Sequence, residues 1–422
     1  MVATPSMPPP TPFAVPESFP ITWPSPEHAM LTFRQDRMHS PFPMTPMSGW
    51  WSQHFAVGMT EAFRVYSAPM RCDALWLNTY FYLGINPAVP PEEMARFEED
   101  APAVFQAAAA RAWDRWQGEW LPELNAGWER WKSRDLPSLP DAELASAARE
   151  AVEWYERIWT IHFEMLLPAM LGASLFEELY TDLFPERDAL SAYRLVQGFD
   201  SMSLEAGREL WLIARAAGED EAVARLVRET PVDSLWDAIG TAPEAAELKE
   251  RLDAYLSAYG LRSDNVQELA TVSWIEDPTP PLANLKAYID DPTDPRAVMA
   301  QQADEREQFL SETRAALAHH PEAARQGFEA LLKIAQAFGR LQEDHNFWID
   351  QRGTHEMRQL CLAIGHRLAA RDVIERTADV FLLDLDEALE ALQGGNAGAK
   401  DLVASRRAEM EHWAQVAPPP MI

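Results

Sequence analysis

An ionisable cluster interrupts the apolar face of a predicted helix in the segment LQEDHNFWIDQR, residues 341–352. His345 falls on the stripe marked by Leu341 and Trp348, where a buried aliphatic residue is expected, and Asp344 precedes it. An imidazole is the commonest general base near neutral pH, and a nearby carboxylate can orient the ring or tune its basicity. The segment therefore makes His345 a candidate catalytic base, with Asp344 as its partner.

The neighbours of His345 follow from helical geometry. Asp344 and His345 are about 100° apart around the helix, so both side chains can border one cavity. Trp348 lies one turn beyond His345, and Arg352 lies about two turns beyond it, where its guanidinium could hold an anionic oxygen. A second interpretation makes His345 a hydrogen-bonded core histidine, with the acids paired to arginines of other helices. The helix pattern alone leaves both interpretations open.

Further polar candidates lie near the start of the chain. Asp36, Arg37 and His39 occupy a stretch whose prolines prevent a regular helix, and loops carry function more often than core elements do. Trp50 and Trp51 follow and offer aromatic surface to an organic ligand. We expect these five residues to contact a substrate, with local turn chemistry as the alternative for the first three.

The elements that must position these residues are mostly helices. Helix-forming patterns run from Pro91 to about Tyr259 and again from Arg296 to Arg371, separated by a loop-rich connector. No strand–helix alternation is present, so the sequence predicts a mainly α fold with very little sheet. We expect any sheet to be limited to short pairs near residues 268–276 and 379–384.

Three parts of the chain differ in composition. Residues 1–20 are a Pro-rich tail expected to be disordered or extended. Residues 21–395 form the helical substrate-binding domain, which opens with an irregular Pro- and aromatic-rich segment. Residues 396–422 form a C-terminal helix and tail.

Aromatic residues recur at helical spacing among the sixteen tryptophans of the chain. Trp113, Trp116 and Trp120 share one helix face, and Trp159 and His162 share another. A core stripe explains this pattern, and the lining of a cavity for an organic ligand is the alternative. His162 is expected to be a hydrogen-bonded core histidine rather than a catalytic one.

Composition excludes several classes of function. The 36 Lys+Arg and 66 Asp+Glu residues give a net charge of −30, which argues against nucleic acid or an anionic membrane as a partner. The first residues lack the basic and apolar regions of a secretory signal, and no apolar run is long enough to span a membrane. We therefore expect a soluble, cytoplasmic protein.

Motifs for nucleotides and metals are also missing from the sequence. There is no Walker-type phosphate loop, no GxGxxG after a strand and no GxSxG elbow. One ExxH, from Glu409 to His412, is too little for a di-iron bundle, which needs two such motifs and further carboxylates. The sequence therefore predicts that this chain binds no cofactor and no metal.

Several segments, taken in order, resemble the substrate-binding region of rifampicin phosphotransferase-like proteins, which are relatives of phosphoenolpyruvate synthase. They cover most of the chain from about Ile21 to Leu392. The segments are ITWPSPEHAMLTFRQDRMHSPFPMTPM, LVQGFDSMSLEAGRELWLIAR, AYGLRSDNVQELATVSWIEDP, EDHNFWIDQR and LAIGHRLAARDVIERTADVFLLDLDEAL.

The resemblance implies a function in phosphoryl transfer. In such enzymes an ATP-grasp domain uses ATP and Mg to phosphorylate a histidine on a swivelling domain, which delivers the phosphoryl group to a hydroxyl. Neither of those parts is recognisable here, so the resemblance implies a split enzyme like phenylphosphate synthase. This chain would be the substrate-binding subunit, inactive alone, and its partners would be an ATP-grasp subunit and a phosphohistidine carrier on separate chains. The substrate would be a small organic hydroxyl compound, and we expect it to be aromatic.

The resemblance also assigns roles to residues. His345 would take the hydroxyl proton and Arg352 would hold a phosphoryl oxygen. Arg262 and Glu268 lie in the family's connector and would approach the incoming phosphate, with surface pairing as the alternative. The chain has Glu-Asp-His where the rifampicin enzymes have Arg-Glu-x-x-Lys, so the expected substrate is not rifampicin.

Two rival functions remain open from the sequence. One is a non-catalytic helical binding protein for an aromatic ligand, which would explain the tryptophans. The other is a cofactor-free lyase that uses His345 as its base.

Overall fold

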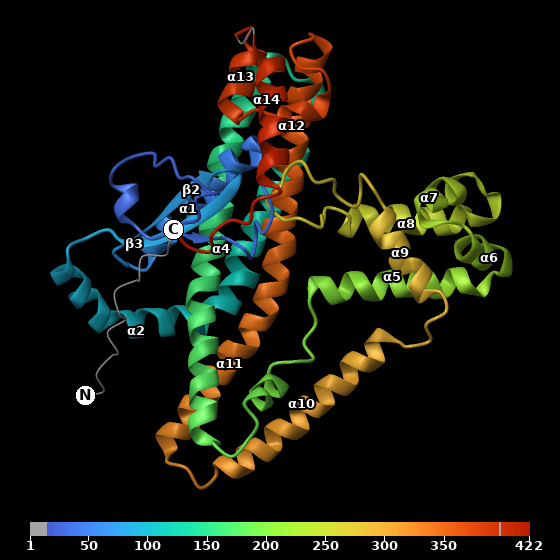
Figure 1. The fold of residues 1–422 in the computed structure, drawn as a ribbon. Coiled ribbons are helices and arrows are strands. Elements are labelled where there is room, and N and C mark those ends of the chain that lie inside the picture. The colour runs from blue at the N-terminus through green and yellow to red at the C-terminus, as the bar shows by residue number, and fades with distance from the viewer. Residues whose placement is uncertain (1–14, 396–397) are drawn as a thin grey trace.

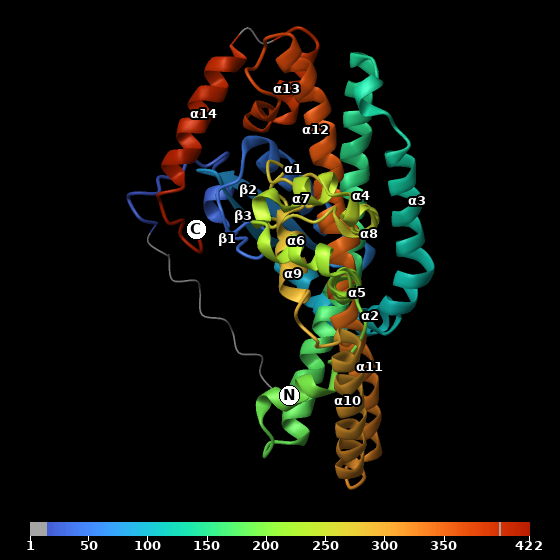
Figure 2. The same cartoon turned by 90° about the vertical axis from the view of Figure 1, so that its right-hand side faces the viewer.

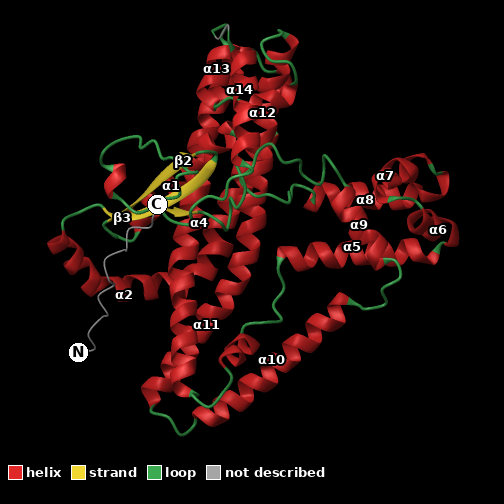
Figure 3. Ribbon diagram, in the orientation of Figure 1, coloured by secondary structure: helices red, strands yellow, loops and turns green. Residues whose placement is uncertain are grey.

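The computed structural model describes residues 15–395 and 398–422, and it is mainly α-helical (Figure 3). The expected fold class is therefore confirmed. The α-helices are α1 Pro46–Val65, α2 Pro91–Arg115, α3 Leu121–Lys132, α4 Asp141–Leu183, α5 Met202–Glu219, α6 Glu221–Glu229, α7 Val232–Thr241, α8 Ala246–Tyr259, α9 Thr279–Tyr288, α10 Pro295–Leu317, α11 Glu322–His345, α12 Arg352–Ala370, α13 Leu385–Leu392 and α14 Ala399–Trp413.

Short helical turns connect or interrupt these helices. The 3-10 turns are η1 His28–Met30, η3 Leu136–Ser138, η4 Ala189–Leu195, η5 Pro243–Ala245 and η7 Thr377–Leu382. Two further turns, η2 Trp116–Trp120 and η6 Asn346–Gln351, are π-helical and lie inside longer helical runs. A π-turn inserts one residue into the helix, and such insertions occur frequently at functional sites.

The sheet lies near the start of the chain, not where the sequence predicted it. Strands β1 Arg34–Gln35, β2 Met70–Leu77 and β3 Tyr80–Pro87 form an antiparallel sheet in the order β1-β3-β2. Asn78 and Thr79 close the β2–β3 hairpin with φ values of 50° and 66°, the left-handed pair that a tight hairpin turn requires. The expected strand pairs near residues 268–276 and 379–384 are wrong, because these residues form loops, turns and η7.

The centre of the fold is α4, which lies beside α11 and also packs against α1 (Figure 1). Glycines allow these close approaches. A Cβ at Gly58 of α1 would lie 2.5 Å from Trp159 Cβ, and a Cβ at Gly172 of α4 would lie 2.4 Å from Ile334 Cγ2. The main core therefore forms where α1 and α11 contact α4, and this is where His162 and His345 lie.

By length and mean hydropathy α4 could cross a membrane, although the sequence showed no uninterrupted apolar run of that length. In this structure, however, 61% of its most apolar window is buried inside the protein. Its apolar residues pack on neighbouring helices, as in the core helix of a soluble protein.

Helices α5 to α9 form a lobe with a hydrophobic cluster of its own, which includes Leu210, Val227, Leu235, Leu252 and Leu285. The lobe projects to one side of the α4–α11 pair, and in Figure 2 it faces the viewer. Ser201 caps α5 by accepting a hydrogen bond from the Leu204 amide. Helix α10 leads from the lobe back to the far end of the α4–α11 pair (Figure 1).

Both ends of the described chain pack against the sheet region. Of the Pro-rich tail expected over residues 1–20, residues 1–14 lie outside the described residues, while Phe19 is buried against Tyr80 and Trp413. At the other end, the Phe33 and Ile422 backbones exchange two hydrogen bonds of 2.9 Å.

Candidate functional site

His345 lies at the junction between α11 and the π-turn η6. An i→i+5 turn places residues five positions apart on the same side of the helix, whereas in an α-helix they would diverge by about 140°. His345 and Asp350 are separated by five positions, and Nε2 of His345 lies 3.6 Å from Oδ2 of Asp350. The π-turn therefore gives His345 a carboxylate partner that regular helical spacing would have turned away.

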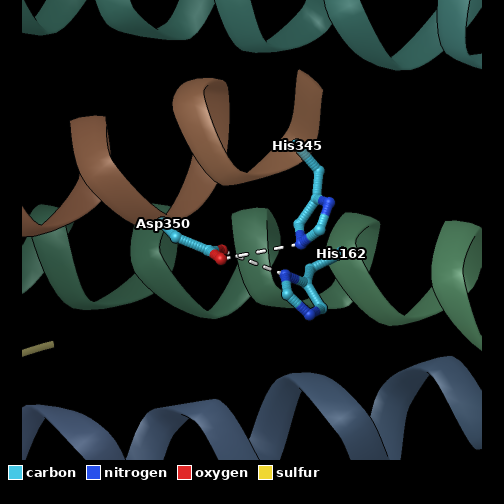
Figure 4. A group of neighbouring side chains, drawn as sticks. All are labelled: His162, His345 and Asp350. Atoms are coloured by element: carbon cyan, nitrogen blue, oxygen red, sulfur yellow. Dashed lines mark hydrogen bonds and ion pairs between the residues drawn. The ribbon is translucent and has the colours of Figure 1, made fainter. Parts of the chain in front are cut away.

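His162 of α4 meets this pair from the opposite helix (Figure 4). Its Nδ1 lies 3.1 Å from Asp350 Oδ1, and its ring is nearly perpendicular to the His345 ring, with the centroids 4.6 Å apart. The exposed fractions of the three side chains are 2% for His162, 6% for His345 and 2% for Asp350. We call these three residues the buried triad.

A second carboxylate–histidine pair lies beside the buried triad. Asp36 and His39 belong to the loop after β1, and the His39 Nδ1 lies 2.9 Å from Asp36 Oδ2. The same carboxylate accepts a hydrogen bond of 3.2 Å from the His39 amide, which fixes the turn. The His39 ring packs edge-on against Phe55 and His162, with centroid distances of 5.5 and 6.2 Å. With 18% of its side chain exposed, His39 is the more accessible part of the cluster.

Burial and charge set the protonation of the rings. Burial lowers the pKa of His345 to about 4 and lowers the pKa of His162 well below its ordinary value. Burial also raises the pKa of Asp350. At His39 burial acts in the same direction as at His345, but the hydrogen bond and charge of Asp36 outweigh it and raise the pKa of His39. His162 and His345 are therefore neutral near pH 7, and His39 is the most basic of the three imidazoles.

The geometry suits proton removal at His39. Asp36 occupies Nδ1 of this ring, so a neutral His39 that donates from Nδ1 presents the lone pair of Nε2. A carboxylate in this position fixes the tautomer and stabilises the imidazolium that forms when Nε2 takes a proton. In the buried triad, His345 instead donates from Nδ1 to the Leu341 carbonyl at 2.8 Å and directs Nε2 at Asp350.

Asp344 does not partner His345. Its carboxylate accepts a hydrogen bond of 3.2 Å from the Met202 amide at the start of α5, and burial raises its pKa. Adjacent residues on a helix diverge by about 100°, and here that divergence directs Asp344 at the α5 lobe while His345 enters the core. The expected Asp344–His345 pair is thus replaced by Asp350–His345.

Arg352 and Trp348 form a separate group next to the site. The Arg352 guanidinium lies 5.7 Å from the Trp348 ring and 5.5 Å from the Trp128 ring, and its Nε lies 3.6 Å from Glu356. The extra residue of the π-turn shifts the register between His345 and Arg352, so the two do not point the same way as the α-helical spacing predicted.

The early candidates divide between surface, core and site. Asp36 and His39 belong to the site, whereas Arg37 is exposed. Trp50 donates from Nε1 to Asp386 of α13 at 3.1 Å, and Trp51 is 1% exposed and packs against the core. Neither tryptophan takes part in the histidine cluster.

The connector residues hold the connector in place. Glu268 is buried and accepts hydrogen bonds of 2.8 Å from the Thr45 amide, the Thr45 hydroxyl and the Ser48 hydroxyl at the start of α1. Arg262 donates to the Met202 carbonyl at 3.1 Å, and its guanidinium lies over the Phe347 ring. In this structure both residues join segments of the fold rather than face an open phosphate site.

Sequence reasoning missed the role of Asp350 in the site. His162 was expected to be a hydrogen-bonded core histidine, and its burial and its contact with Asp350 confirm this, although the sequence did not show that it meets His345. Asp350 received no role, since α-helical spacing turns it away from His345. The signal that could have found it is an acid next to the apolar Ile349, five positions after a buried histidine.

An apolar cavity of about 300 Å³ lies between α4, η4 and α11 and is lined by residues that include Met170, Phe176, Ala335, Phe338 and Gln342. None of its lining residues belongs to the histidine cluster, although Gln342 is only three positions before His345. The cavity is therefore a neighbour of the site and not the site itself.

Comparison with known proteins identifies the class. Residues 162–343 match the family described as rifampicin phosphotransferase fourth domain. Chondramide synthase cmdD of Chondromyces crocatus is 33% identical over 416 residues, which cover 96% of this chain and 11% of that protein. The uncharacterized phosphotransferase YvkC of Bacillus subtilis (strain 168) is 24% identical over 258 residues, which cover 60% of this chain and 31% of that protein.

These matches define a helical domain related to phosphotransferases. The match over residues 162–343 and the similarity to YvkC support a relationship to rifampicin phosphotransferase-like proteins, as the resemblance of the segments implied. The matched region spans about a tenth of the length of chondramide synthase cmdD and about a third of the length of YvkC.

Proposed function

We propose that this chain is the substrate-binding subunit of a phosphotransferase in which a phosphohistidine on a partner delivers its phosphoryl group to a hydroxyl of a small organic substrate. One observation carries the proposal. The Asp36–His39 pair, from one end of the sequence, lies against the buried triad contributed by α4, α11 and η6. An oriented imidazole with a free Nε2 is what a hydroxyl needs in order to attack phosphorus.

The proposed step forms one bond and breaks one. The substrate oxygen attacks the phosphorus atom, the bond between phosphorus and the carrier's imidazole nitrogen breaks, and the hydroxyl proton passes to Nε2 of His39. Asp36 stabilises the resulting imidazolium, which then releases its proton to solvent, while the departing imidazole of the carrier takes up one proton from solvent and becomes neutral. General-base assistance of this kind contributes roughly 10²- to 10⁴-fold to the rate.

The sequence assigned proton removal to His345, and the geometry favours His39. His345 is more deeply buried, and its lowered pKa makes it the weaker base. We assign His345, together with His162 and Asp350, to the rear wall of the site. From there His162 positions the His39 ring through their edge-on contact.

An aromatic substrate fits the surroundings of His39. Phe55 and Trp159 lie beside the His39 ring, with centroids 5.5 and 6.4 Å away. On the solvent side of the same loop, Met38 and Phe42 are 84% and 63% exposed, so apolar side chains border the approach to His39. Such surfaces favour a phenol or another apolar hydroxyl compound over a sugar.

The proposal assigns the remaining chemistry to partners. ATP and Mg would be used by an ATP-grasp subunit, and a phosphohistidine carrier on another chain would visit this one, in the cytoplasm where ATP is available.

Reconstitution tests the proposed function. The full chain is mixed with ATP, Mg, a family ATP-grasp subunit and a phosphohistidine carrier, and a panel of phenols, alcohols and sugars is screened by mass spectrometry. We expect a phosphorylated phenol or apolar alcohol only when all components are present. Formation of the phosphorylated product without this chain would contradict the proposal. Conversion of the substrate to an alkene without any transfer of a phosphoryl group would also contradict it.

A further inference from the structure

We infer that His162, His345 and Asp350 bind a divalent transition-metal ion. One donor atom from each side chain lies within 4.8 Å of the others. The contacts are 3.1 Å between His162 Nδ1 and Asp350 Oδ1 and 3.6 Å between His345 Nε2 and Asp350 Oδ2. Ligand atoms at about 2.0–2.2 Å from a tetrahedral ion lie roughly 3.3–3.6 Å from one another, so the two contacts to Asp350 are close to the spacing of metal ligands.

Nε2 of His345 has no hydrogen-bond partner among the described residues, whereas Nδ1 of His162 contacts Asp350 Oδ1 at 3.1 Å. His345 donates from Nδ1 to the Leu341 carbonyl at 2.8 Å, so a neutral ring carries a lone pair on Nε2. That lone pair faces an oxygen of Asp350, which is also an acceptor. At 3.6 Å the two atoms are too far apart to share a proton in a good hydrogen bond. A cation between them converts a repulsive contact into two bonds.

The Leu341 carbonyl completes an arrangement common in metalloproteins. A histidine that binds a metal through one nitrogen almost always donates from the other to a carbonyl, a carboxylate or water, which fixes the tautomer. His345 has this contact, and the π-turn holds Asp350 on the same side.

The donor set selects the ion. Two imidazole nitrogens and one carboxylate oxygen suit Zn²⁺, Mn²⁺ or Fe²⁺, whereas Mg²⁺ and Ca²⁺ prefer oxygen ligands alone. Three protein ligands also leave at least one coordination position free, as in catalytic rather than structural zinc sites. The inferred ion is therefore distinct from the Mg that the ATP-grasp partner would use.

A role for the ion rests on the proposed function, although its binding does not. The His39 ring lies 6.2 Å from the His162 ring, so the free position of the ion would be near the proposed base. A substrate hydroxyl bound to the ion would have a lowered pKa and would lose its proton to His39 more readily.

Metal binding can be measured on the chain alone. The full chain, without an affinity tag, is stripped with a chelator and titrated with Zn²⁺ by calorimetry, and bound metal is counted by elemental analysis. We expect one Zn²⁺ per chain. Asp350→Asn and His345→Gln should each weaken the affinity by more than roughly 100-fold, since they remove a ligand rather than an outer contact, whose loss typically costs 10–100-fold.

Matched controls separate the triad from its surroundings. Asp344→Asn changes the acid adjacent to His345, and His355→Gln changes a histidine of α12 outside the triad. Both should bind Zn²⁺ as the wild type does. Binding that is equal in Asp350→Asn and in the wild type would overturn the inference.

The absorption spectrum of the Co²⁺-loaded wild type keeps the inference testable if a triad variant fails to fold. Coordination by two imidazoles and a carboxylate in a site of low coordination number should give intense visible bands. The weak spectrum of hydrated Co²⁺, or a wild type that binds no stoichiometric metal, would overturn it. Neither measurement uses substrate or partners, so failure of the proposed transfer reaction would leave this result unchanged.

Discussion

Glu268→Ala should destabilise the protein strongly, because one carboxylate holds the connector to the start of α1. Glu268 accepts four hydrogen bonds of 2.8 Å, from the Thr45 amide and hydroxyl, the Ser48 hydroxyl and the Ala270 amide. Each hydrogen bond to a charged group is worth about 1.5–3 kcal/mol. The full sum is not expected, because the Thr45 and Ser48 hydroxyls lie 2.9 Å apart and can pair with each other. Burial also raises the pKa of Glu268, because desolvation disfavours its charged form.

We expect a loss of about 3–5 kcal/mol, which is well below the sum of the four hydrogen-bond contributions because the two hydroxyls can pair with each other. Urea denaturation, fitted with a common slope, measures it. Glu268→Gln should lose less, since one oxygen acceptor remains, and the exposed Glu250→Ala should stay within about 0.5 kcal/mol of the wild type. A stable Glu268→Ala protein that fails in phosphoryl transfer would refute this reasoning and favour the phosphate-facing role that the sequence suggested.

Three further predictions follow from the packing, the charges and the motifs. Gly58→Ala should lower the melting temperature by several degrees. The new Cβ would lie 2.5 Å from Trp159 Cβ and 2.8 Å from the Thr160 amide nitrogen, so α1 must move away from α4. An unchanged melting temperature would show that the two helices separate freely. Burial lowers the pKa of His355 to about 4, so the folded protein protonates this imidazole less readily than the unfolded chain does. The free energy of unfolding should therefore decrease as the pH falls from about 6.5 towards 4. His355→Gln should remove up to about 3 kcal/mol of that acid-dependent loss, as measured by denaturation at pH 7 and pH 4, and an identical loss in both proteins would contradict the prediction. Purified alone, the chain should neither bind ATP with useful affinity nor become phosphorylated, because its sequence has no phosphate loop; tight binding in calorimetry would contradict the split-enzyme proposal.

The sequence led to the neighbourhood of the site but not to its pairing. His345 stood out because a histidine interrupted an apolar stripe, and Asp36 and His39 because prolines excluded a helix around them. Asp350 could not be paired with His345, since that contact depends on a π-turn that changes the local register. His162 looked like a core residue, and only the packing of α4 on α11 and η6 shows which groups it meets.

The fold was predictable in class and less so in its sheet. Helical periodicity is a strong local signal, and the mainly α class followed from it. Strands β2 and β3 lie in a short segment between two helical regions, closed by Asn78 and Thr79 without a glycine, so the usual hairpin signal is missing. The β-branched and aromatic residues of segment 268–276 and the apolar run within 379–384 resembled strands, but these segments form loops, turns and η7.

Single-turnover transfer from a phosphorylated carrier to the identified hydroxyl substrate tests the central claim most directly. His39→Gln removes the proposed base and keeps a side chain of similar size, and its melting temperature shows whether the fold survives. We expect the transfer rate constant to fall roughly 10²- to 10⁴-fold while substrate binding and folding are retained, and His355→Gln to transfer at the wild-type rate. A folded His39→Gln protein that transfers within a factor of about two of the wild type, well below the usual contribution of a general base, would contradict the account.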